Sequence, residues 1–335
     1  MRIGLRRLFT LSALLAAGSA HAQLSGSLVK GQFGLQSGTQ PPEGVVATLF
    51  AYDYYATTIK GPNGDSLATS GSLNLIAAPG LNLWLVSPWK LLGANYGAVL
   101  SLWGASASVD APRFNASQST YGFGDMYVKP VELGWHTPHL DAITGFAIWI
   151  PTGRYTPGGD NNTGQGQWGY ELTLGATAWL EKEHHLNLAT QIFFDLYSDR
   201  RGAVGPSNTQ LHTGDTLTLQ GGLGYQLLGG GLNFGIPYFV QWKVTADTLP
   251  PGVGAILPAI SGAKSFSAGV GAEVALYWST TDGVNARWVQ GIGGKNTTNG
   301  ASFFLLYNHL FSLPGEKKVP DTLQSPARSP ELSWR

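Results

Sequence analysis

The stretch Leu232-Asn-Phe-Gly-Ile-Pro-Tyr-Phe-Val-Gln-Trp-Lys-Val244 alternates between two kinds of side chain. Its first face is apolar or aromatic and holds Leu232, Phe234, Ile236, Tyr238, Val240, Trp242 and Val244. Its second face holds Asn233, Gly235, Pro237, Phe239, Gln241 and Lys243. A period of two indicates a β-strand. Soluble strands are most often about 5–6 residues long, whereas a tilted strand that crosses a bilayer needs about 9–11. The stretch therefore predicts a membrane-spanning strand.

The same alternation recurs at 171–180, 187–197, 216–227 and 265–278. In each segment one face is apolar, and the other carries Gly, Thr, Gln and isolated charges, as the wall of a watery lumen would. Trp179, Trp242 and Trp278 lie at or near strand ends, where we expect an aromatic girdle at the membrane interfaces. A soluble sandwich also alternates, but its strands are shorter and need no girdle.

Twelve strands are expected, at 45–58, 71–86, 95–108, 123–136, 139–151, 167–181, 185–198, 215–228, 231–245, 264–279, 283–294 and 300–311. Long links rich in Gly, Pro, Asn and Asp at 59–70, 109–122, 152–166, 199–214 and 246–263 alternate with short ones. The link at 295–299 stands where this alternation calls for a long link, but it is short. This asymmetry is typical of an outer-membrane barrel. The sequence predicts an all-β fold, a transmembrane antiparallel β-barrel of about 12 strands with long extracellular loops and short periplasmic turns.

The composition agrees with a barrel and excludes several other classes of protein. Charged residues make up 12% of the 335, about half the usual share, while 43% are hydrophobic and 11% aromatic. The formal net charge is +0, which argues against nucleic acid as a partner. The absence of cysteine excludes disulfides, thiolate metal sites and cysteine nucleophiles.

The two ends of the chain are expected to lie outside the barrel domain at 45–311. Residues 1–22 resemble a cleaved signal peptide, with Arg2, Arg6 and Arg7 before an apolar run and Ala20-His21-Ala22 as the cleavage site. Residues 23–44 form an N-terminal arm that either hangs loose or enters the lumen. Residues 312–335 are rich in proline and charge, and we expect a disordered periplasmic tail.

The strand at 300–311 carries Phe303, Leu305, Tyr307, His309 and Phe311 on one face. An apolar face that ends in an aromatic residue resembles the signal that outer-membrane barrels present to the barrel-assembly machinery. We therefore take Tyr307 and Phe311 as the assembly signal and the assembly machinery as a partner, along with outer-membrane lipids.

Two short motifs resemble those of a known family. Gly122-Phe123-Gly124-Asp125 opens a strand, and Ile150-Pro151-Thr152-Gly153 follows about 25 residues later. In a barrel-like chain with a signal peptide, they resemble the outer-membrane family named for the MetA pathway of phenol degradation. The resemblance implies a passive channel for small molecules, aromatic or hydrophobic ones included. Each motif also has a purely structural interpretation, because glycines permit turns and proline ends strand pairing.

Charges that strand parity places on the inner face are the candidate lumen lining. They are Asp53, Asp125, Lys129, Asp141, Glu171, Asp195, Lys243, Glu273 and Arg287. Such side chains either form a salt-bridged network that stiffens the barrel or select solutes by charge and hydrogen bonding. Six acids against three bases favour cations or neutral solutes. Pro130 is expected to introduce a bulge, which leaves the parity around Lys129 and Glu132 open.

Enzymatic function is not expected, because no His-x-Ser pair lies on a strand and the histidines are scattered over turns, a loop and an outward face. A lipid hydrolase is accordingly the third alternative. The first is an outer-membrane channel or transporter for a small-molecule solute in a Gram-negative bacterium, and the second is a structural or surface-interaction barrel without transport. No cofactor and no metal are expected.

Overall fold

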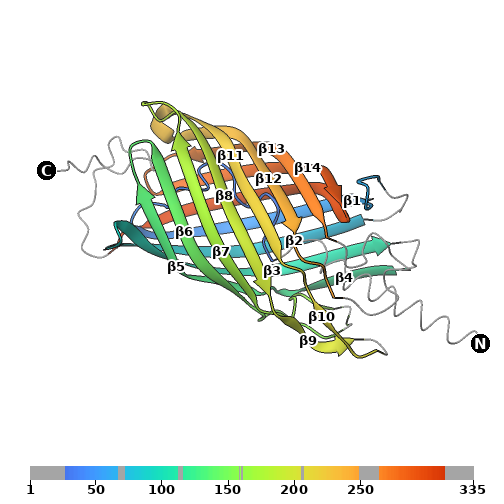
Figure 1. Cartoon of the computed structure of the whole chain (residues 1–335). Coiled ribbons are helices and arrows are strands. Elements are labelled where there is room, and N and C mark those ends of the chain that lie inside the picture. The colour runs from blue at the N-terminus through green and yellow to red at the C-terminus, as the bar shows by residue number, and fades with distance from the viewer. Residues whose placement is uncertain are drawn as a thin grey trace, which may run out of the picture.

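The computed structural model describes residues 27–66, 72–111, 116–157, 159, 161–204, 207–248 and 264–313, and shows an all-β fold (Figure 1). The single helical element in this part is the 3₁₀ turn η2, Leu228–Gly230. No helix in the described ranges is long and apolar enough to span a membrane. The expected signal peptide at 1–22 and residues 314–335 of the expected tail lie outside the described residues.

Most strands match the segments expected from the alternating pattern, with boundaries that differ by several residues at some ends. Two short strands, β9 and β10, instead lie within the long link expected at 199–214. The strands are β1 (Gly44–Lys60), β2 (Ser72–Leu91), β3 (Ala94–Ala111), β4 (Ala116–Phe123), β5 (Met126–His136), β6 (Leu140–Ile150), β7 (Gly169–Trp179), β8 (Leu186–Tyr197), β9 (Asp199–Val204), β10 (Thr209–His212), β11 (Thr216–Leu227), β12 (Leu232–Lys243), β13 (Phe266–Tyr277), β14 (Asp282–Lys295) and β15 (Thr297–Phe311).

One antiparallel sheet closes into a barrel of twelve strands, as expected, once β4 and β5 are taken as one interrupted strand. Sequence neighbours pair throughout, and β8 pairs with β11 across the loop that contains β9 and β10. The ring closes where β1 pairs with β15, from Val45 opposite Phe311 to Lys60 opposite Thr297. Closure removes the unpaired strand edges that a membrane interior does not tolerate.

The fourth strand starts earlier than expected and is broken once. β4 pairs with the far half of β3, and β5 pairs with its near half. The break falls at Gly124 and Asp125, in the first family motif. The long link expected at 109–122 is therefore mostly strand.

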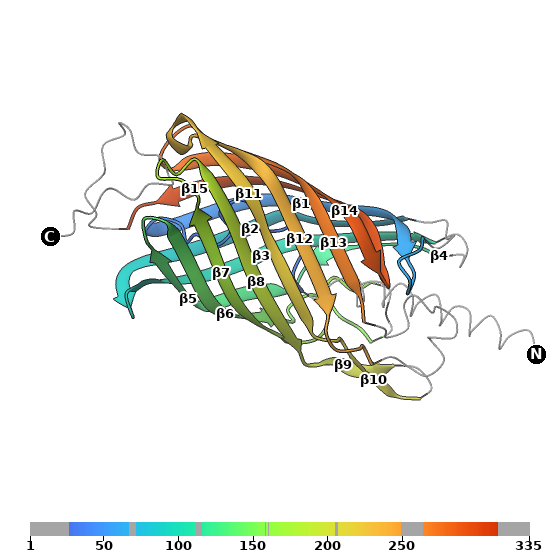
Figure 2. The same cartoon turned by 45° about the horizontal axis from the view of Figure 1, so that its top comes forward.

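Loops and turns separate to opposite ends of the barrel, as Figure 2 shows. One end has tight turns, such as Leu92-Gly93 between β2 and β3, where both residues have positive φ angles of 54° and 81°, as a two-residue hairpin requires. The other end holds the long links and the small β9–β10 hairpin. We call these the periplasmic end and the outer end, according to the usual orientation of such barrels.

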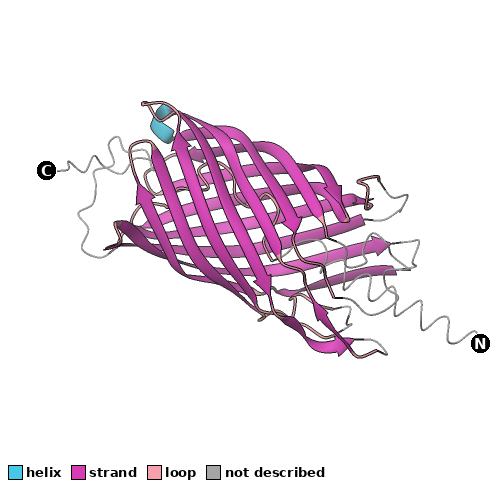
Figure 3. Ribbon diagram, in the orientation of Figure 1, coloured by secondary structure: helices cyan, strands magenta, loops and turns pink. Residues whose placement is uncertain are grey.

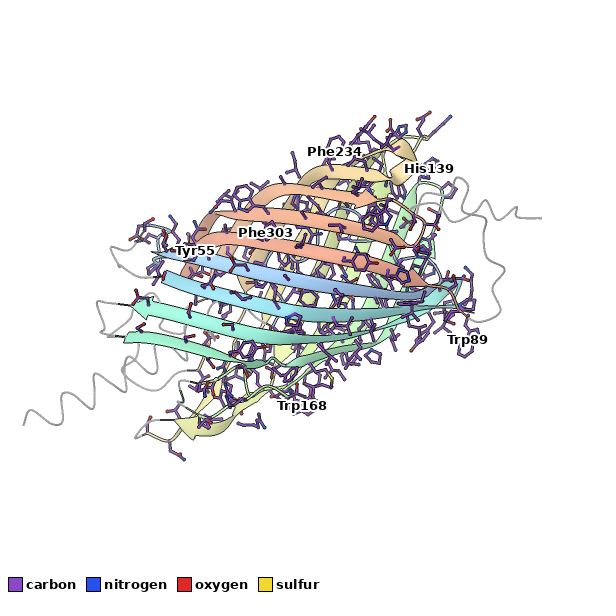
Figure 4. The ribbon with its side chains drawn as sticks, turned by 180° about the vertical axis from the view of Figure 1, so that it is seen from behind. Tyr55, Trp89, His139, Trp168, Phe234 and Phe303 are labelled. Carbon is purple, nitrogen blue, oxygen red and sulfur yellow. The ribbon has the colours of Figure 1, made fainter. Side chains whose placement is uncertain are left out.

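The outer surface of the wall is apolar, with aromatic side chains near both ends. Figure 4 shows Tyr55 and Trp89 toward opposite ends, with Phe234 and Phe303 on the wall between them. Trp242 and Trp278 are exposed on this surface, as expected of a girdle, but Trp179 is not. It points into the lumen, where its indole N–H donates to Asp141 Oδ2 at 3.1 Å. A buried Trp usually finds a hydrogen-bond partner for its N–H, and Asp141 is that partner here.

Candidate functional site

The lumen is the candidate site, because the polar faces of the strands meet there. On β12, Asn233, Gln241 and Lys243 are buried while Phe234 and Ile236 are exposed, so parity is as expected. Seven of the nine candidate charges lie buried on inner faces. They are Lys129, Asp141, Glu171, Asp195, Lys243, Glu273 and Arg287.

Asp53 does not line the lumen. It is exposed on the outer surface of β1, where its Oδ1 accepts a hydrogen bond from Asn74 Nδ2 at 2.5 Å. Tyr52 and Tyr54 point inward instead, and the hydroxyl of Tyr54 lies 2.8 Å from that of Thr298. The alternating pattern placed Asp53 on the wrong face because it counted the neighbouring tyrosines as apolar. The hydroxyl of a tyrosine makes it suited to a polar interior as well.

The N-terminal segment 27–43 runs through the lumen, which is one of the two arrangements expected for the arm. The blue colour of Figure 1 identifies this segment behind the front strands, and Figure 3 draws it as a loop. Near the outer end, Lys30 Nζ donates to Thr297 Oγ1 at 3.1 Å, and the Phe33 N–H donates to Gln220 Oε1 at 3.2 Å. Residues far apart in sequence are joined by these bonds, so the segment lies against the inner wall.

Toward the periplasmic end the same segment contacts the opposite part of the wall. The Gly38 N–H donates to Thr177 Oγ1 at 3.1 Å, and Thr39 Oγ1 donates to Asp141 Oδ2 at 2.9 Å. A side chain at Gly38 would overlap the backbone of Ala176, so the close approach of segment and wall requires glycine here. The segment thus occupies much of the passage that a barrel of this size would otherwise leave.

Arg287 and Glu273 form an ion pair on the wall that also binds the segment. Their two hydrogen bonds, Nε to Oε2 at 2.6 Å and Nη2 to Oε1 at 2.8 Å, have the bidentate geometry that arginine favours with carboxylates. Arg287 Nη1 also donates to the carbonyls of Gly31, at 3.2 Å, and Gln32. Glu273 Oε2 in turn accepts the Leu35 N–H at 3.1 Å. These two charges act in a structural network.

A bulge at Pro130 brings Lys129 and Glu132 to the same side of the wall. The registers of β5 with β3 and with β6 both shift around this proline. Lys129 Nζ therefore reaches Glu132 Oε2 at 3.2 Å, with both side chains buried. Glu132 is a lumen residue that parity alone did not assign, and the proline is the signal that points to it.

Glu171 and Asp195 are direct cross-strand partners on β7 and β8, and both are fully buried. Tyr127 donates its hydroxyl proton to Glu171 Oε1 at 2.8 Å, and Thr216 donates to Asp195 Oδ2 at 3.0 Å. Within the described residues, Glu171 Oε2 and Asp195 Oδ1 have no hydrogen-bond partner. Tyr127 and Thr216 were not among the sequence candidates, because a single hydroxyl in an alternating strand carries no distinctive signal.

The two family motifs meet at the outer end. Asp125, the remaining candidate, accepts the Gly153 N–H at 2.9 Å with Oδ1 and the Gln165 N–H at 2.7 Å with Oδ2. Thr152 Oγ1 accepts the Met126 N–H at 3.0 Å. Asp125 therefore fastens the β6–β7 loop to the break in the fourth strand, as the structural interpretation of the motifs expects.

The histidines do not form a catalytic or metal-binding group in the described residues. His136, His212 and His309 each contact one aspartate, Asp141, Asp199 and Asp282, at 3.1, 3.0 and 2.7 Å. Across the same residues no cluster of three His, Cys, Asp or Glu side chains could hold a metal ion.

A closed barrel with an apolar outer wall, a polar lumen and a segment through that lumen defines a β-barrel protein of the Gram-negative outer membrane. The profile of the family described as "Putative MetA-pathway of phenol degradation" matches residues 52–307, and the chain belongs to this family. No curated protein matches the chain significantly.

Solved structures with a similar fold are outer-membrane barrels. The COG4313 outer membrane channel from Pseudomonas putida F1 is 14% identical, with a TM-score of 0.69 over 82% of this chain and 97% of that one. The beta domain of the Bordetella autotransporter BrkA is 14% identical, with a TM-score of 0.48 over 81% and 100%. The CymD monoaromatic hydrocarbon channel is 11% identical, with a TM-score of 0.40 over 81% and 89%. At these identities the likeness concerns the fold alone.

Proposed function

We propose that the protein is a passive outer-membrane channel for small hydrophobic or aromatic molecules. The observation that carries this is the lumen itself, a closed wall with a polar inner face around segment 27–43. A barrel filled in this way suits small solutes rather than bulky hydrophilic ones. Membership of a family described for phenol degradation supports an aromatic solute.

An enzymatic function is not proposed. In the described residues His136, His212 and His309 contact carboxylates rather than a serine nucleophile, and the buried acids bond to wall residues or to the segment. A barrel without transport is the remaining alternative, and the Arg287–Glu273 network that fixes the segment favours it. The two are separated by whether solutes pass.

Single-channel recording of the purified full chain in planar bilayers tests the proposal. We expect small discrete openings whose current noise changes when phenol is added, because a solute in a narrow lumen obstructs ions. Ser207→Ala, at the exposed tip of the β9–β10 hairpin, serves as a variant that leaves the inner wall unchanged. A protein that inserts but stays silent under all conditions would support the structural barrel instead.

A further inference from the structure

Three buried cations converge at the outer end of the lumen from three separate parts of the chain. Lys30 belongs to the N-terminal segment, Arg200 to β9 and Lys243 to the end of β12, and their relative exposures are only 7%, 4% and 3%. Thr213, the hydrogen-bond partner of Arg200, precedes Gly214, whose N–H donates to the Asp247 carboxylate that pairs with Lys243. Burial and the nearby charge of Lys243 lower the pKa of Lys30 to about 7. Like charges gathered away from water are unfavourable unless anions accompany them.

The described residues compensate only part of this charge. Lys243 Nζ is paired with Asp247, at 2.6 and 2.7 Å from its two carboxylate oxygens. Lys30 donates to the neutral hydroxyl of Thr297. Neither Lys30 nor Arg200 takes part in an ion pair within the described ranges. Lys30 and Arg200 are left with neutral hydrogen-bond partners.

Arg200 binds neutral side chains within the described residues. A guanidinium has five N–H donors in a planar fork, and here Nε and Nη2 donate to the same hydroxyl, Thr213 Oγ1, at long distances of 3.4 and 3.3 Å. That hydroxyl donates its own proton to Gln167 Oε1 at 2.8 Å. Burial lowers the pKa of Arg200, while the neighbouring Tyr155, Asp247 and Asp125 raise it.

The nearby acids are engaged elsewhere. Asp125 uses both oxygens for the backbone N–H groups of the β6–β7 loop. Asp247 accepts the Gly214 N–H at 2.7 Å in addition to Lys243. Asp195 on β8 is separated from Lys243 on β12 by β11, and it accepts a hydrogen bond from Thr216 of that strand. No described carboxylate pairs with the guanidinium of Arg200. A planar guanidinium matches a carboxylate in shape and charge.

Aromatic side chains lie on the inner wall of β8, the strand that leads to the hairpin of Arg200. Tyr197, at the end of β8, accepts the Ser27 N–H with its hydroxyl at 2.7 Å. Phe193, on the same face of β8 and fully buried, packs on Phe33 with ring centroids 4.8 Å apart. A solute whose anionic group met the cations would find an aromatic wall for its body.

We propose that Arg200, assisted by Lys30 and Lys243, binds the carboxylate of an anionic solute with an aromatic or aliphatic body at the outer end of the lumen. This proposal names a class of solute for the proposed channel. It rests on that function, in which the solute enters the lumen from outside. It also predicts that the outer end prefers anions, whereas the count of lumen acids favours cations or neutral solutes.

Calorimetric titration of the purified full chain in detergent tests the site, with benzoate, benzyl alcohol and inorganic phosphate as probes. We expect Arg200→Gln to weaken benzoate binding at least about tenfold, the loss typical of a hydrogen bond to a charged group, and Lys30→Gln to weaken it less. Benzyl alcohol binding should not change. The matched control is Arg201→Gln, because Arg201 is the exposed neighbour in the same hairpin.

Heat-modifiable gel mobility shows that each variant is folded. Benzoate binding that is absent from the wild type, or equal in wild type and Arg200→Gln, overturns the inference. So does phosphate that displaces benzoate at equal concentration, since the site would then hold any anion. The proposed function fails separately: Arg200-dependent benzoate binding by a protein that is silent in bilayers supports the site and refutes the channel.

Discussion

At the scale of single residues, the lumen contains two kinds of acid. Glu273 is matched by the fork of Arg287 and by the Leu35 N–H. Glu171 and Asp195 each keep one oxygen without a partner in the described residues. The first kind fixes the structure, and the second is buried between β7 and β8 with an oxygen that no described residue binds. Mutations at the two should therefore have different consequences.

Arg287→Gln should destabilise the folded barrel, because Glu273 would be left as an uncompensated buried charge, at a cost of about 3–5 kcal/mol. The temperature at which the folded band disappears on unboiled gels measures this. The double variant Arg287→Met/Glu273→Leu should recover much of the loss, since both charges are gone. Equal loss in the single and the double variant would contradict the assignment of a buried pair.

Neutralising the unpaired acids with Glu171→Gln and Asp195→Asn should shift the reversal potential in a salt gradient away from cations. The effect should fade at 1 M salt, where the Debye length is about 3 Å. Asp53→Asn is the matched control, because Asp53 lies on the outer surface. An unchanged ion preference in the double variant would place both acids in a structural network.

At the scale of elements, one segment closes the barrel and another occupies its lumen. β15 completes the barrel by pairing with β1, and its outward face ends at Phe311. Segment 27–43 fills the lumen without belonging to the sheet. The first should matter for assembly and the second for conductance.

Phe311→Ala should lower the yield of folded barrel if Tyr307 and Phe311 are the assembly signal, whereas removal of 314–335 should matter little. The fraction of heat-modifiable protein in isolated outer membranes gives the yield. The reverse order of effects would mean that the tail is part of the fold.

Deletion of residues 27–40 should raise single-channel conductance several-fold, because the segment occupies cross-section that ions could use. Removal of 314–335 provides a control deletion at the other terminus. If the deleted barrel inserts and conducts like the full chain, the segment does not restrict the passage.

At the scale of the whole molecule, closure makes the wall one hydrogen-bonded unit with an apolar exterior. We expect the mature protein in the outer-membrane fraction, with faster migration on gels when unheated than when boiled, because closed barrels resist detergent without heat. Recovery as a soluble periplasmic protein would refute the membrane assignment.

The period of two by itself determined the class of fold, the twelve strands and most of the inner faces. This follows because every membrane strand must bury one face in lipid and pair all its backbone groups. Each strand's own sequence therefore alternates, and stretches such as 232–244 show this without information about the neighbouring strands.

Only the tertiary structure decided what happens inside the ring. Asp53 lies outside because tyrosine is compatible with either face, and Lys129 and Glu132 lie together because the bulge at Pro130 shifts the register. The course of segment 27–43, the contact of Asp125 with Gly153 and the convergence of Lys30, Arg200 and Lys243 depend on residues far apart in sequence. No local period encodes such contacts, because they exist only once the sheet has closed.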